Sequence, residues 1–573
     1  MCGIAGFAFG GAPVNADELR RFTDALMHRG PDGVGCFVDG EIGLGHRRLA
    51  ILDTSEAGNC PLTMRAPDGR TIVITYNGEV YNFLELRKEL ERAGFAFRGT
   101  GDTEVVAAAL LHWGNAALDR FNGMFAVAAW EPSARRFLLA RDRFGVKPLY
   151  LQAGKRLAFA SELKAFLTLD DASPTVNERI FRLTLQDAGR VEGTEIETLL
   201  SDVVQLPAGH LLQLDAQGKG GISRWWNPDA HLRSAPARYD EQVAQFRELL
   251  FDAVRLRLRS DVPVGTCLSG GIDSSAVAGV MAALHSGKSG DLQRSASDWR
   301  HAFVSTAPGS ALNEQVHAKA VADFVRAESH YIAFDSAQAN EVVLDSIWSS
   351  ESAAGIAATP VWLLNRAIAA TGVRVTLDGH GGDEVLGGYT PHLRVPRREL
   401  NAYLDGQITR DVLPGILRNF DRATMAHGIE SRMPLLDWRL VTFSRALPPD
   451  AKLGGGFTKR VLRDAIQGLV PEQIRRRRSK VGFNAPLIEW ANSSLAPLLR
   501  AAMQLPFWQQ NPYFDGPRLS REYNARMTAA PWRYDDWQSL SQLCALVSLT
   551  IWHRQFIEGV REPLDVDEFA HAA

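Results

Sequence analysis

The chain has 573 residues, with 63 lysines and arginines against 66 aspartates and glutamates, and a formal net charge of −3. This near balance excludes a broad basic surface for nucleic acid or an anionic membrane, and it favours small charged or zwitterionic substrates. The length allows two large domains, each with its own core. The five cysteines are scattered and form no CxxC pair. We therefore expect neither a disulfide scaffold nor a cysteine-rich zinc site, and we infer a reducing, cytoplasmic compartment.

The first residues, MCGIAGFAFGG, are apolar but are too short to span a bilayer. No positively charged segment precedes them and no cleavage-type segment follows, so we do not expect a signal peptide. No run of about 18 apolar residues occurs elsewhere, and this predicts a soluble protein.

The first third of the chain predicts an α+β domain of packed sheets. Short apolar runs bounded by turn-forming residues are typical of strands, and they cover residues 70–82, 124–130, 136–142 and 156–162. Residues 83–94 and 102–114 carry apolar residues at helical spacing and end on glycine. We assign residues 1–215 to this domain.

Residues 216–240 are rich in Gly, Pro, Ser and charged residues, which predicts a linker. After it, residues 241–573 alternate between strand and helix patterns, as in a doubly wound α/β domain with a parallel sheet. Two Gly-rich loops follow predicted strands, SGGIDSS at 269–275 and GHGGDE at 379–384. Ligands in such folds bind where loops leave the carboxyl ends of the strands, so both loops are candidate binding loops. Beyond about residue 400 the chain is predicted to be mostly helical, and the part beyond about 490 carries no motif.

Cys2 combines a thiol with a free α-amino group if the initiator methionine is removed. An α-amino group has a pKa near 7.7–8.0, so it can act as a general base close to neutral pH. The structural alternative is a small apolar residue at the start of a buried strand.

The motifs that accompany Cys2 favour the catalytic interpretation. They are HRGPDG (28–33), GHRRLAILD (45–53), YNGEVYN (76–82) and TGDTEV (100–105). Together with MCGIAGF they resemble the glutaminase domain of class II, Ntn-type glutamine amidotransferases. FNGMFAVAAW, RDRFGVKPLY and FASELKAF resemble the glutamine-hydrolysing asparagine synthetases in particular.

The resemblance implies a role for each residue of the glutaminase site. Cys2 would attack the glutamine amide and release ammonia, while Asn77 and the Gly78 N–H would form the oxyanion hole. Arg48, or alternatively Arg47, would bind the α-carboxylate. Glu79 and Asp102 would bind the α-ammonium. The structural alternative for Asp102 is a helix N-cap.

SGGIDSS resembles the pyrophosphate-binding loop of ATP pyrophosphatases, and it lacks the GxxxxGK[ST] pattern of a P-loop. The near miss ALHSGKS at 283–289 is interpreted as a helix end. The resemblance assigns the loop to ATP, through Leu268, Ser269, Gly270, Gly271, Asp273, Ser274 and Ser275.

The same resemblance assigns Asp273 and Asp383 to Mg²⁺, which prefers carboxylate and phosphate oxygens. Lys480 would neutralise the leaving pyrophosphate, and no function is assigned to Arg475–Arg478. The acyl-adenylate pocket is expected to contain Asp383 as well, together with Gly379, Glu384, Glu430 and Arg432. Glu430 and Arg432 could instead form a buried ion pair beneath that pocket.

His380 departs from the family pattern. The family usually carries an acidic residue at this position, and the related β-lactam-forming synthetases carry Tyr. A neutral imidazole can also take a proton, so the chemistry is retained while the identity of the acceptor becomes open. The structural alternative is tolerated variation in a loop whose metal ligand is Asp383.

These features predict a glutamine-dependent amide synthetase. ATP would adenylate the aspartate side chain, and ammonia passing through the protein interior would displace AMP to give asparagine. The expected small-molecule partners are glutamine, ATP, Mg²⁺ and aspartate, with no nucleic acid or membrane partner and a possible homodimer. One alternative is another carboxylate acceptor, such as a secondary metabolite, sugar acid or peptide. The other is a non-catalytic module derived from this fold.

Overall fold

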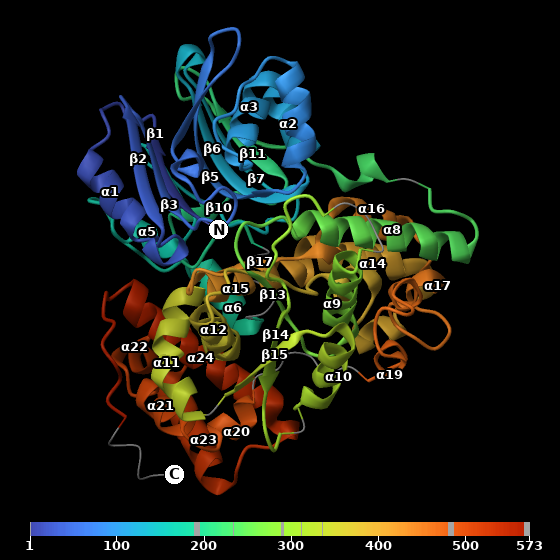
Figure 1. The fold of residues 1–573 in the computed structure, drawn as a ribbon. Coiled ribbons are helices and arrows are strands. Elements are labelled where there is room, and N and C mark those ends of the chain that lie inside the picture. The colour runs from blue at the N-terminus through green and yellow to red at the C-terminus, as the bar shows by residue number, and fades with distance from the viewer. Residues whose placement is uncertain are drawn as a thin grey trace.

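The computed structural model describes residues 2–187, 195–232, 234–287, 292–310, 312–334, 336–479 and 486–566. Two stacked sheets form the N-terminal domain, and a parallel sheet surrounded by helices forms the C-terminal domain (Figure 1). The expected fold class is confirmed.

Both sheets of the N-terminal domain are antiparallel and six-stranded. The first sheet has the order β10 (Val203–Gln205), β8 (Tyr150–Ala153), β9 (Leu157–Ala160), β1 (Gly3–Ala8), β3 (Ile42–Arg48), β2 (Gly33–Asp39). The second has the order β12 (Gly220–Arg224), β11 (His210–Leu214), β7 (Arg136–Arg141), β6 (Gly123–Glu131), β5 (Thr71–Val80), β4 (Leu62–Arg65). The four strands expected from the sequence appear as β5, β6, β7 and β9.

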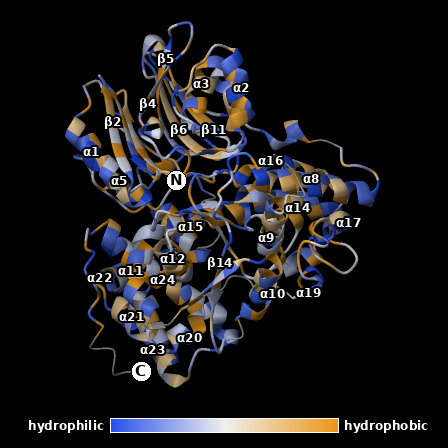
Figure 2. Cartoon of the chain, in the orientation of Figure 1, coloured by the Kyte–Doolittle hydropathy of each residue, from blue (hydrophilic) through white to orange (hydrophobic). Residues whose placement is uncertain are grey.

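Apolar side chains fill the space between the two sheets, among them Ile4, Leu44, Ala126 and Leu139. Helix α1 (Ala16–Asp24) packs on the first sheet, and α3 (Thr103–Trp113) packs on the second beside α2 (Phe83–Arg92). Helix α2 has one hydrophobic and one hydrophilic face (Figure 2) and buries its apolar residues. The result is a four-layer αββα sandwich.

The N-terminal sheet extends further than the sequence predicts. Strand β12 lies inside the segment 216–240, which was expected to be a linker, and pairs with β11 from Leu214 opposite Gly220 to His210 opposite Arg224. Its Gly-rich sequence occupies an exposed edge, where side-chain packing contributes little to the strand signal. The N-terminal domain therefore continues to at least Arg224, past the predicted boundary at residue 215.

The C-terminal domain is built on a five-stranded parallel sheet. Its order is β15 (Glu328–Ala333), β14 (His301–Thr306), β13 (Val264–Cys267), β16 (Val375–Leu377), β17 (Glu430–Arg432). The chain moves outward from β13 to β15 and then returns to the other side of β13 as β16. The point where the strand order reverses lies between β13 and β16, and both Gly-rich loops leave the sheet there.

Helices connect and cover these strands (Figure 1). Those around the sheet are α8 (Tyr239–Arg257), α9 (Ile272–His285), α10 (Gln315–Val325), α11 (Ser336–Ser350), α12 (Gly355–Ala370), α13 (Gly382–Leu386), α14 (Leu400–Gly406), α15 (Leu413–Met425), α16 (Trp438–Ala446) and α18 (Arg460–Ala465). The final helices are α20 (Leu487–Ala491), α21 (Leu495–Ala502), α22 (Pro506–Gln510), α23 (Gly516–Ala529) and α24 (Trp537–Phe556). Short helices complete the chain: α4 (Ala117–Arg120), α5 (Leu163–Phe166), α6 (Glu178–Gln186), α17 (Pro449–Lys452) and α19 (Glu472–Arg475).

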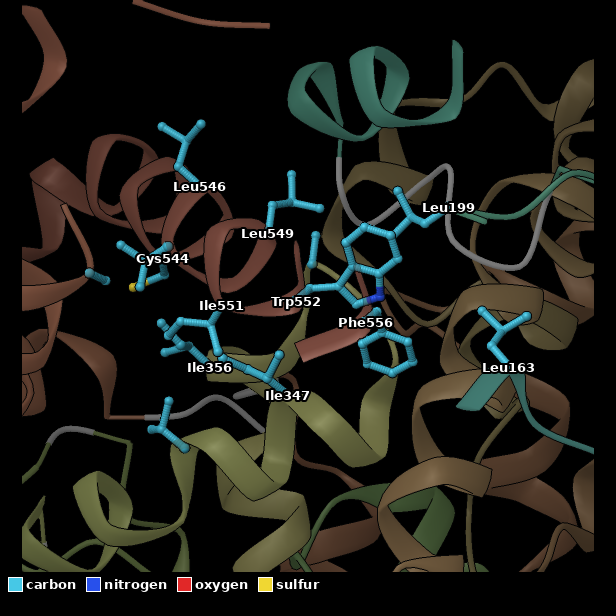
Figure 3. Packing of buried hydrophobic residues seen from close by; sticks show 14 of the residues in the cluster. Leu163, Leu199, Ile347, Ile356, Cys544, Leu546, Leu549, Ile551, Trp552 and Phe556 are labelled. Carbon is cyan, nitrogen blue, oxygen red and sulfur yellow. The ribbon is translucent and has the colours of Figure 1, made fainter. Parts of the chain in front are cut away.

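The final helix α24 joins the two domains through a shared hydrophobic core. Figure 3 shows Trp552 and Phe556 of α24 in one cluster with Leu163 and Leu199 of the N-terminal domain, and all four are nearly or completely buried. The segment beyond residue 490, which carried no motif, therefore has a packing role.

No single helix among the described residues is both long and apolar enough to cross a membrane. The helix pair Glu341–Ser350 and Gly355–Ala370 is long and apolar enough only when both helices are taken together, and it is bent by 101° at the break between them. Ile347 and Ile356 of this pair are buried in the same core as Trp552.

A cluster of six buried charges also crosses the domain interface. Arg29, Glu162 and Lys164 come from the N-terminal domain, and Glu351, Asp421 and Arg422 come from the C-terminal domain. Each of these side chains is at most 3% exposed.

Arg29 is central to this interdomain charge cluster. Its Nη1 lies 2.6 Å from Glu162 Oε1 and 2.8 Å from Asp421 Oδ2. Glu351 accepts hydrogen bonds from the backbone N–H groups of Leu163 and Lys164 at 3.0 and 2.8 Å. Two cations and one anion on one side face one cation and two anions on the other, so the domains present complementary charge.

Candidate functional site

Cys2 immediately precedes β1, at the base of the N-terminal domain where the two domains meet (Figure 1). Its backbone nitrogen is 3.0 Å from Asn77 Oδ1, and Arg29 Nε donates to its carbonyl oxygen at 3.0 Å. The thiol sulfur lies 3.9 Å from the Leu49 carbonyl oxygen. Burial raises the pKa of the Cys2 thiol, so formation of a nucleophilic thiolate at neutral pH requires a neighbouring base.

The side chain of Asn77 is oriented by its bond to Cys2. Asn77 is fully buried on β5, and its Nδ2 has no hydrogen-bond partner among the described residues. Gly78 follows on the same strand, where a Cβ atom would stand 2.2 Å from the Met124 carbonyl oxygen. An unused amide donor beside a thiol is the arrangement that an oxyanion hole needs.

Arg47 and Arg48 are neighbours on β3, and their side chains point to opposite faces because successive side chains of a strand alternate. Arg47 Nη2 pairs with Asp24 Oδ1 of α1 at 2.8 Å. Arg48 instead binds the loop that follows β3, through the Ser55 carbonyl at 2.7 Å and Asn59 Oδ1 at 2.8 Å. Arg48 is therefore the arginine on the side of the Leu49–Asn59 loop, and its contact with glutamine stays a prediction.

Asp102 precedes α3, but its carboxylate does not cap that helix. Its Oδ2 accepts from the Tyr76 hydroxyl and the Val80 N–H, each at 2.8 Å. Burial raises the pKa of Asp102 to about 6. The N-cap alternative is wrong for this side chain, which is held against β5 beside Asn77 and Gly78.

Burial and the charge of Asp102 raise the pKa of Glu79 well above its usual range. Glu79 Oε2 is buried and has no hydrogen-bond partner among the described residues. Two buried carboxyl groups side by side, one with an unused acceptor atom, fit a small cation such as an α-ammonium group.

Glu430 and Arg432 lie on β17 and are fully buried. Arg432 Nε is 2.6 Å from Glu430 Oε1, and Arg432 Nη2 is 3.6 Å from Glu79 Oε1. The Arg432 Nη1 also donates to the carbonyl of Arg257 at 2.7 Å. The alternative of a buried ion pair describes these contacts, and the pair reaches from the C-terminal sheet to Glu79 of the N-terminal domain.

The second site lies at the reversal point between β13 and β16. Gly270 has a positive φ of 73°, and a Cβ atom there would stand 2.5 Å from the Ala318 nitrogen. Ser269 Oγ lies 3.2 Å from Ser274 Oγ and accepts from the Gly271 N–H at 3.2 Å. Leu268 is buried, and Ser275 Oγ donates to the Gly271 carbonyl oxygen at 2.7 Å. The loop thus opens onto the N-terminus of α9, a favourable position for phosphate.

Asp273 of the first loop and Asp383 of the second are brought together around Lys459. Lys459 Nζ pairs with Asp273 and lies 2.5 Å from Asp383 Oδ1. Burial lowers the pKa of Lys459, but the two carboxylates outweigh this effect and hold the pKa above its usual value.

Glycines make room for this carboxylate pair. A Cβ atom at Gly382 would stand 2.6 Å from Asp273 Oδ1, and one at Gly388 would stand 1.8 Å from Asp383 Oδ1. At Gly379 it would stand 2.6 Å from the Ser274 nitrogen. The glycines leave no room for other side chains around Asp273 and Asp383. Two carboxylates in such a site are a donor set that fits Mg²⁺.

His380 packs against Phe420 of α15, with ring centroids 3.8 Å apart. Glu384 is buried, and its Oε1 accepts from the Tyr389 hydroxyl at 2.5 Å. Lys480 falls outside the described residues, so its predicted role stays a prediction.

Two basic residues near the second site were not found from the sequence. Lys459 carried no motif, and Arg477 was assigned no function within the basic run. Arg477 Nη2 lies 2.5 Å from Glu314 Oε1, and its Nη1 is 3.4 Å from the Gly270 carbonyl oxygen. Lys459 stands out only because it is buried between two loops that each carry an aspartate. Those loops are far apart in the sequence and are brought together by the fold.

Comparison with known proteins matches both halves of the chain. A family model described as a glutamine amidotransferase domain covers residues 1–226, and one described as asparagine synthase covers residues 245–409 and 407–554. Asparagine synthetase [glutamine-hydrolyzing] 3 of Bacillus subtilis is 30% identical, over 83% of this chain and 86% of its own length.

Further relatives carry similar names. Asparagine synthetase [glutamine-hydrolyzing] 1 of Bacillus subtilis is 27% identical, over 88% of this chain and 90% of its own length. Asparagine synthetase [glutamine-hydrolyzing] 2 of Arabidopsis thaliana is 31% identical, over 81% of this chain and 75% of its own length. A solved structure of the glutamine phosphoribosylpyrophosphate amidotransferase of B. subtilis is 19% identical with a TM-score of 0.31, over 46% of this chain and 60% of its own.

We expect Asp102 to make the stability of the chain depend on pH. Its pKa is about 6 in the folded chain and about 3.9 when unfolded, so between these values the folded state binds more protons. Stability should therefore fall as the pH rises through this window, by roughly 3 kcal/mol. Asp102→Asn removes this contribution, while the fall due to the raised pKa of Glu79 remains. Urea denaturation of both proteins across the window tests the difference, and parallel pH profiles would contradict it.

We also expect Lys459 to hold the carboxylates of Asp273 and Asp383 together. In Lys459→Met the two anions face each other without a cation, so the free energy of unfolding should fall by about 3 kcal/mol. Added Mg²⁺ should restore more stability to this variant than to the wild type. Urea denaturation with and without Mg²⁺ measures both effects, with the exposed Lys155→Met as control. Wild-type stability in Lys459→Met would show that the carboxylates do not need the lysine.

Proposed function

Because the chain belongs to the family of glutamine-hydrolysing asparagine synthetases, we propose that its acceptor is the side-chain carboxylate of aspartate and its product asparagine. The chain is a glutamine-dependent amide synthetase that uses ATP. The match of both halves to relatives of that name, across more than four-fifths of the chain, supports the choice of aspartate.

In the proposed glutaminase half, Cys2 attacks the side-chain amide of glutamine. After removal of Met1, the nitrogen that lies 3.0 Å from Asn77 Oδ1 becomes the α-amine, and it takes the thiol proton. Asn77 Nδ2 and the Gly78 N–H stabilise the negative oxygen of the tetrahedral intermediate. Ammonia leaves, and water then hydrolyses the thioester to glutamate.

The proposed glutamine pocket provides both signs of charge that a zwitterion needs. Arg48 binds the α-carboxylate, and Glu79 with Asp102 binds the α-ammonium. Glu79 and Asp102 are buried close together, and this supports the assignment because a bound cation would stabilise their ionised forms.

In the proposed synthetase half, the loop from Leu268 to Ser275 binds the phosphates of ATP at the start of α9. Asp273 and Asp383 would hold Mg²⁺, which neutralises phosphate charge when it is bound. Lys459 adds a fixed positive charge between these aspartates, and Lys480 is proposed to neutralise the leaving pyrophosphate. The aspartate carboxylate attacks the α-phosphorus, pyrophosphate leaves, and ammonia then displaces AMP from the acyl-adenylate.

Glu384, Gly379 and His380 belong to the loop proposed to face the acyl-adenylate. We propose that the His380 imidazole takes the proton that ammonia loses as it attacks. The ring packs on Phe420, which positions it from the neighbouring helix. Ammonia passes inside the protein, because in water at neutral pH it would be protonated and lose its nucleophilicity.

The departure at His380 supports a second candidate function, amidation of a different carboxylate by the same two half-reactions. A secondary metabolite, sugar acid or peptide would then replace aspartate. A non-catalytic module is a weaker alternative, because the donor sets expected at both sites are present in the described residues apart from Lys480, which lies outside them.

We expect Cys2→Ala to abolish glutamine-driven amide formation and to retain ammonia-driven formation. The substitution removes the nucleophile of one half-reaction and leaves the ATP site unchanged. Product amide is measured with glutamine or with ammonium chloride as nitrogen source. Cys36→Ala, which removes an exposed thiol on β2, is the control and should retain both activities. Loss of ammonia-driven activity in Cys2→Ala would contradict the two-site model.

The acceptor is tested with purified enzyme, ATP, Mg²⁺ and glutamine. We expect aspartate to give AMP, pyrophosphate and asparagine in equal amounts, because each adenylate formed releases one of each. A panel of other carboxylic acids runs in parallel. Turnover of another acid without turnover of aspartate would overturn the proposed acceptor, and absence of pyrophosphate with every acid would support the non-catalytic alternative.

A further inference from the structure

We propose that His301, Glu328 and His330 form a binding site for a transition-metal ion of the Zn²⁺ class, separate from the proposed ATP and Mg²⁺ site. These residues lie at the amino ends of β14 and β15, whereas the ATP loop follows the carboxyl end of β13 (Figure 1). In a parallel sheet these are opposite ends, so the proposed site is distinct from the catalytic machinery.

Strand register brings the three side chains to one face. Strands β14 and β15 are parallel, with His301 opposite Glu328 and Phe303 opposite His330. Residues two apart on a strand share a face, so Glu328 and His330 project to the same side as His301. Figure 1 shows the two strands side by side near α10. The His330 ring also stacks on the buried Phe303, with centroids 4.9 Å apart, and this limits its orientation.

The distances between the donor atoms suit a metal shell. His301 Nδ1 lies 3.0 Å from His330 Nε2, and that nitrogen lies 3.8 Å from Glu328 Oε1. The ligand atoms of all three residues lie within 4.8 Å of one another. Zinc bonds of about 2.0–2.1 Å in tetrahedral geometry place ligand atoms about 3.4 Å apart, within the range of these separations. Small side-chain adjustments are therefore enough to enclose an ion.

A fourth residue orients one of the ligands. His301 Nε2 lies 2.8 Å from Asp298 Oδ1, so this nitrogen carries the ring proton toward the carboxylate. The Nδ1 lone pair then faces the position shared with His330 and Glu328. A carboxylate that holds the far nitrogen of a ligating histidine is the usual outer partner in zinc sites. The arrangement thus contains an oriented ligand as well as three donor groups.

The chemistry of the donors selects the metal. Two imidazoles and one carboxylate favour Zn²⁺ and related ions over Mg²⁺ or Ca²⁺, which take oxygen ligands. The His301 and His330 side chains are 16% and 24% exposed, so an ion can reach them and water can complete the shell. The ion would bridge β14 to the edge strand β15 and stabilise that edge of the sheet.

The test counts zinc equivalents bound by the tag-free full chain after removal of metals with a chelator. We expect the wild type to bind one equivalent more than His301→Gln and His330→Gln. Asp298→Asn should weaken zinc binding at this site about 10-fold or more, because it disorients His301 without removing a ligand. His112→Ala, which removes an exposed histidine on α3, is the control and should bind zinc as the wild type does.

Glu328→Gln provides a variant at an exposed position, where loss of folding is not expected. It should also weaken zinc binding, and zinc should raise the melting temperature of the wild type more than that of Glu328→Gln. Zinc affinity should be lower in acid than at neutral pH, since protonated imidazole does not bind metal. Equal zinc stoichiometry in the wild type and both histidine variants would overturn the proposal and leave a hydrogen-bonded Asp298–His301–His330 chain.

Discussion

The contact on which the two-domain arrangement depends is that of Arg29 with Asp421, because the same guanidinium also holds Glu162 and the Cys2 carbonyl. Charges buried this deeply are costly unless they are fully paired. The N-terminal side has one positive charge in excess and the C-terminal side one negative, so each is uncompensated without the other. Docking the domains therefore satisfies the charges and positions the proposed nucleophile in one step.

Two further contacts cross the interface and also hold the two domains together. Arg432 extends from β17 to Glu79, so a residue of the C-terminal sheet brings a positive charge beside the proposed glutamine pocket. Helix α24 closes the hydrophobic part of the interface through Trp552. Polar and apolar contacts together make relative motion of the domains costly, which suits the proposed passage of ammonia from one site to the other without loss to water.

In the C-terminal domain, the topology of the parallel sheet determines where the two Gly-rich loops meet. The strand order reverses between β13 and β16, and the two loops that leave the sheet there bring Asp273 and Asp383 to one lysine. Glycines at these loops are required by close approach, as at Gly388, where no side chain fits. His380 lies in the second of these loops and packs against Phe420 of α15, so a helix about 40 residues further along the chain limits the orientation of its ring.

The sequence by itself determined the local features: four strands of the N-terminal sheets (β5, β6, β7 and β9), both Gly-rich loops, and Cys2 with its companion motifs. These depend on backbone preference, hydrophobic period and short spacing, which neighbouring residues specify. It placed the end of the first domain too early, because β12 is exposed and carries little packing signal. Only the tertiary structure decided which of Arg47 and Arg48 faces the Leu49–Asn59 loop, that Asp102 binds β5, and that Lys459 separates two aspartates. Arg29 and Asp421 are 392 residues apart, and such pairs arise from packing between elements, which no local pattern encodes.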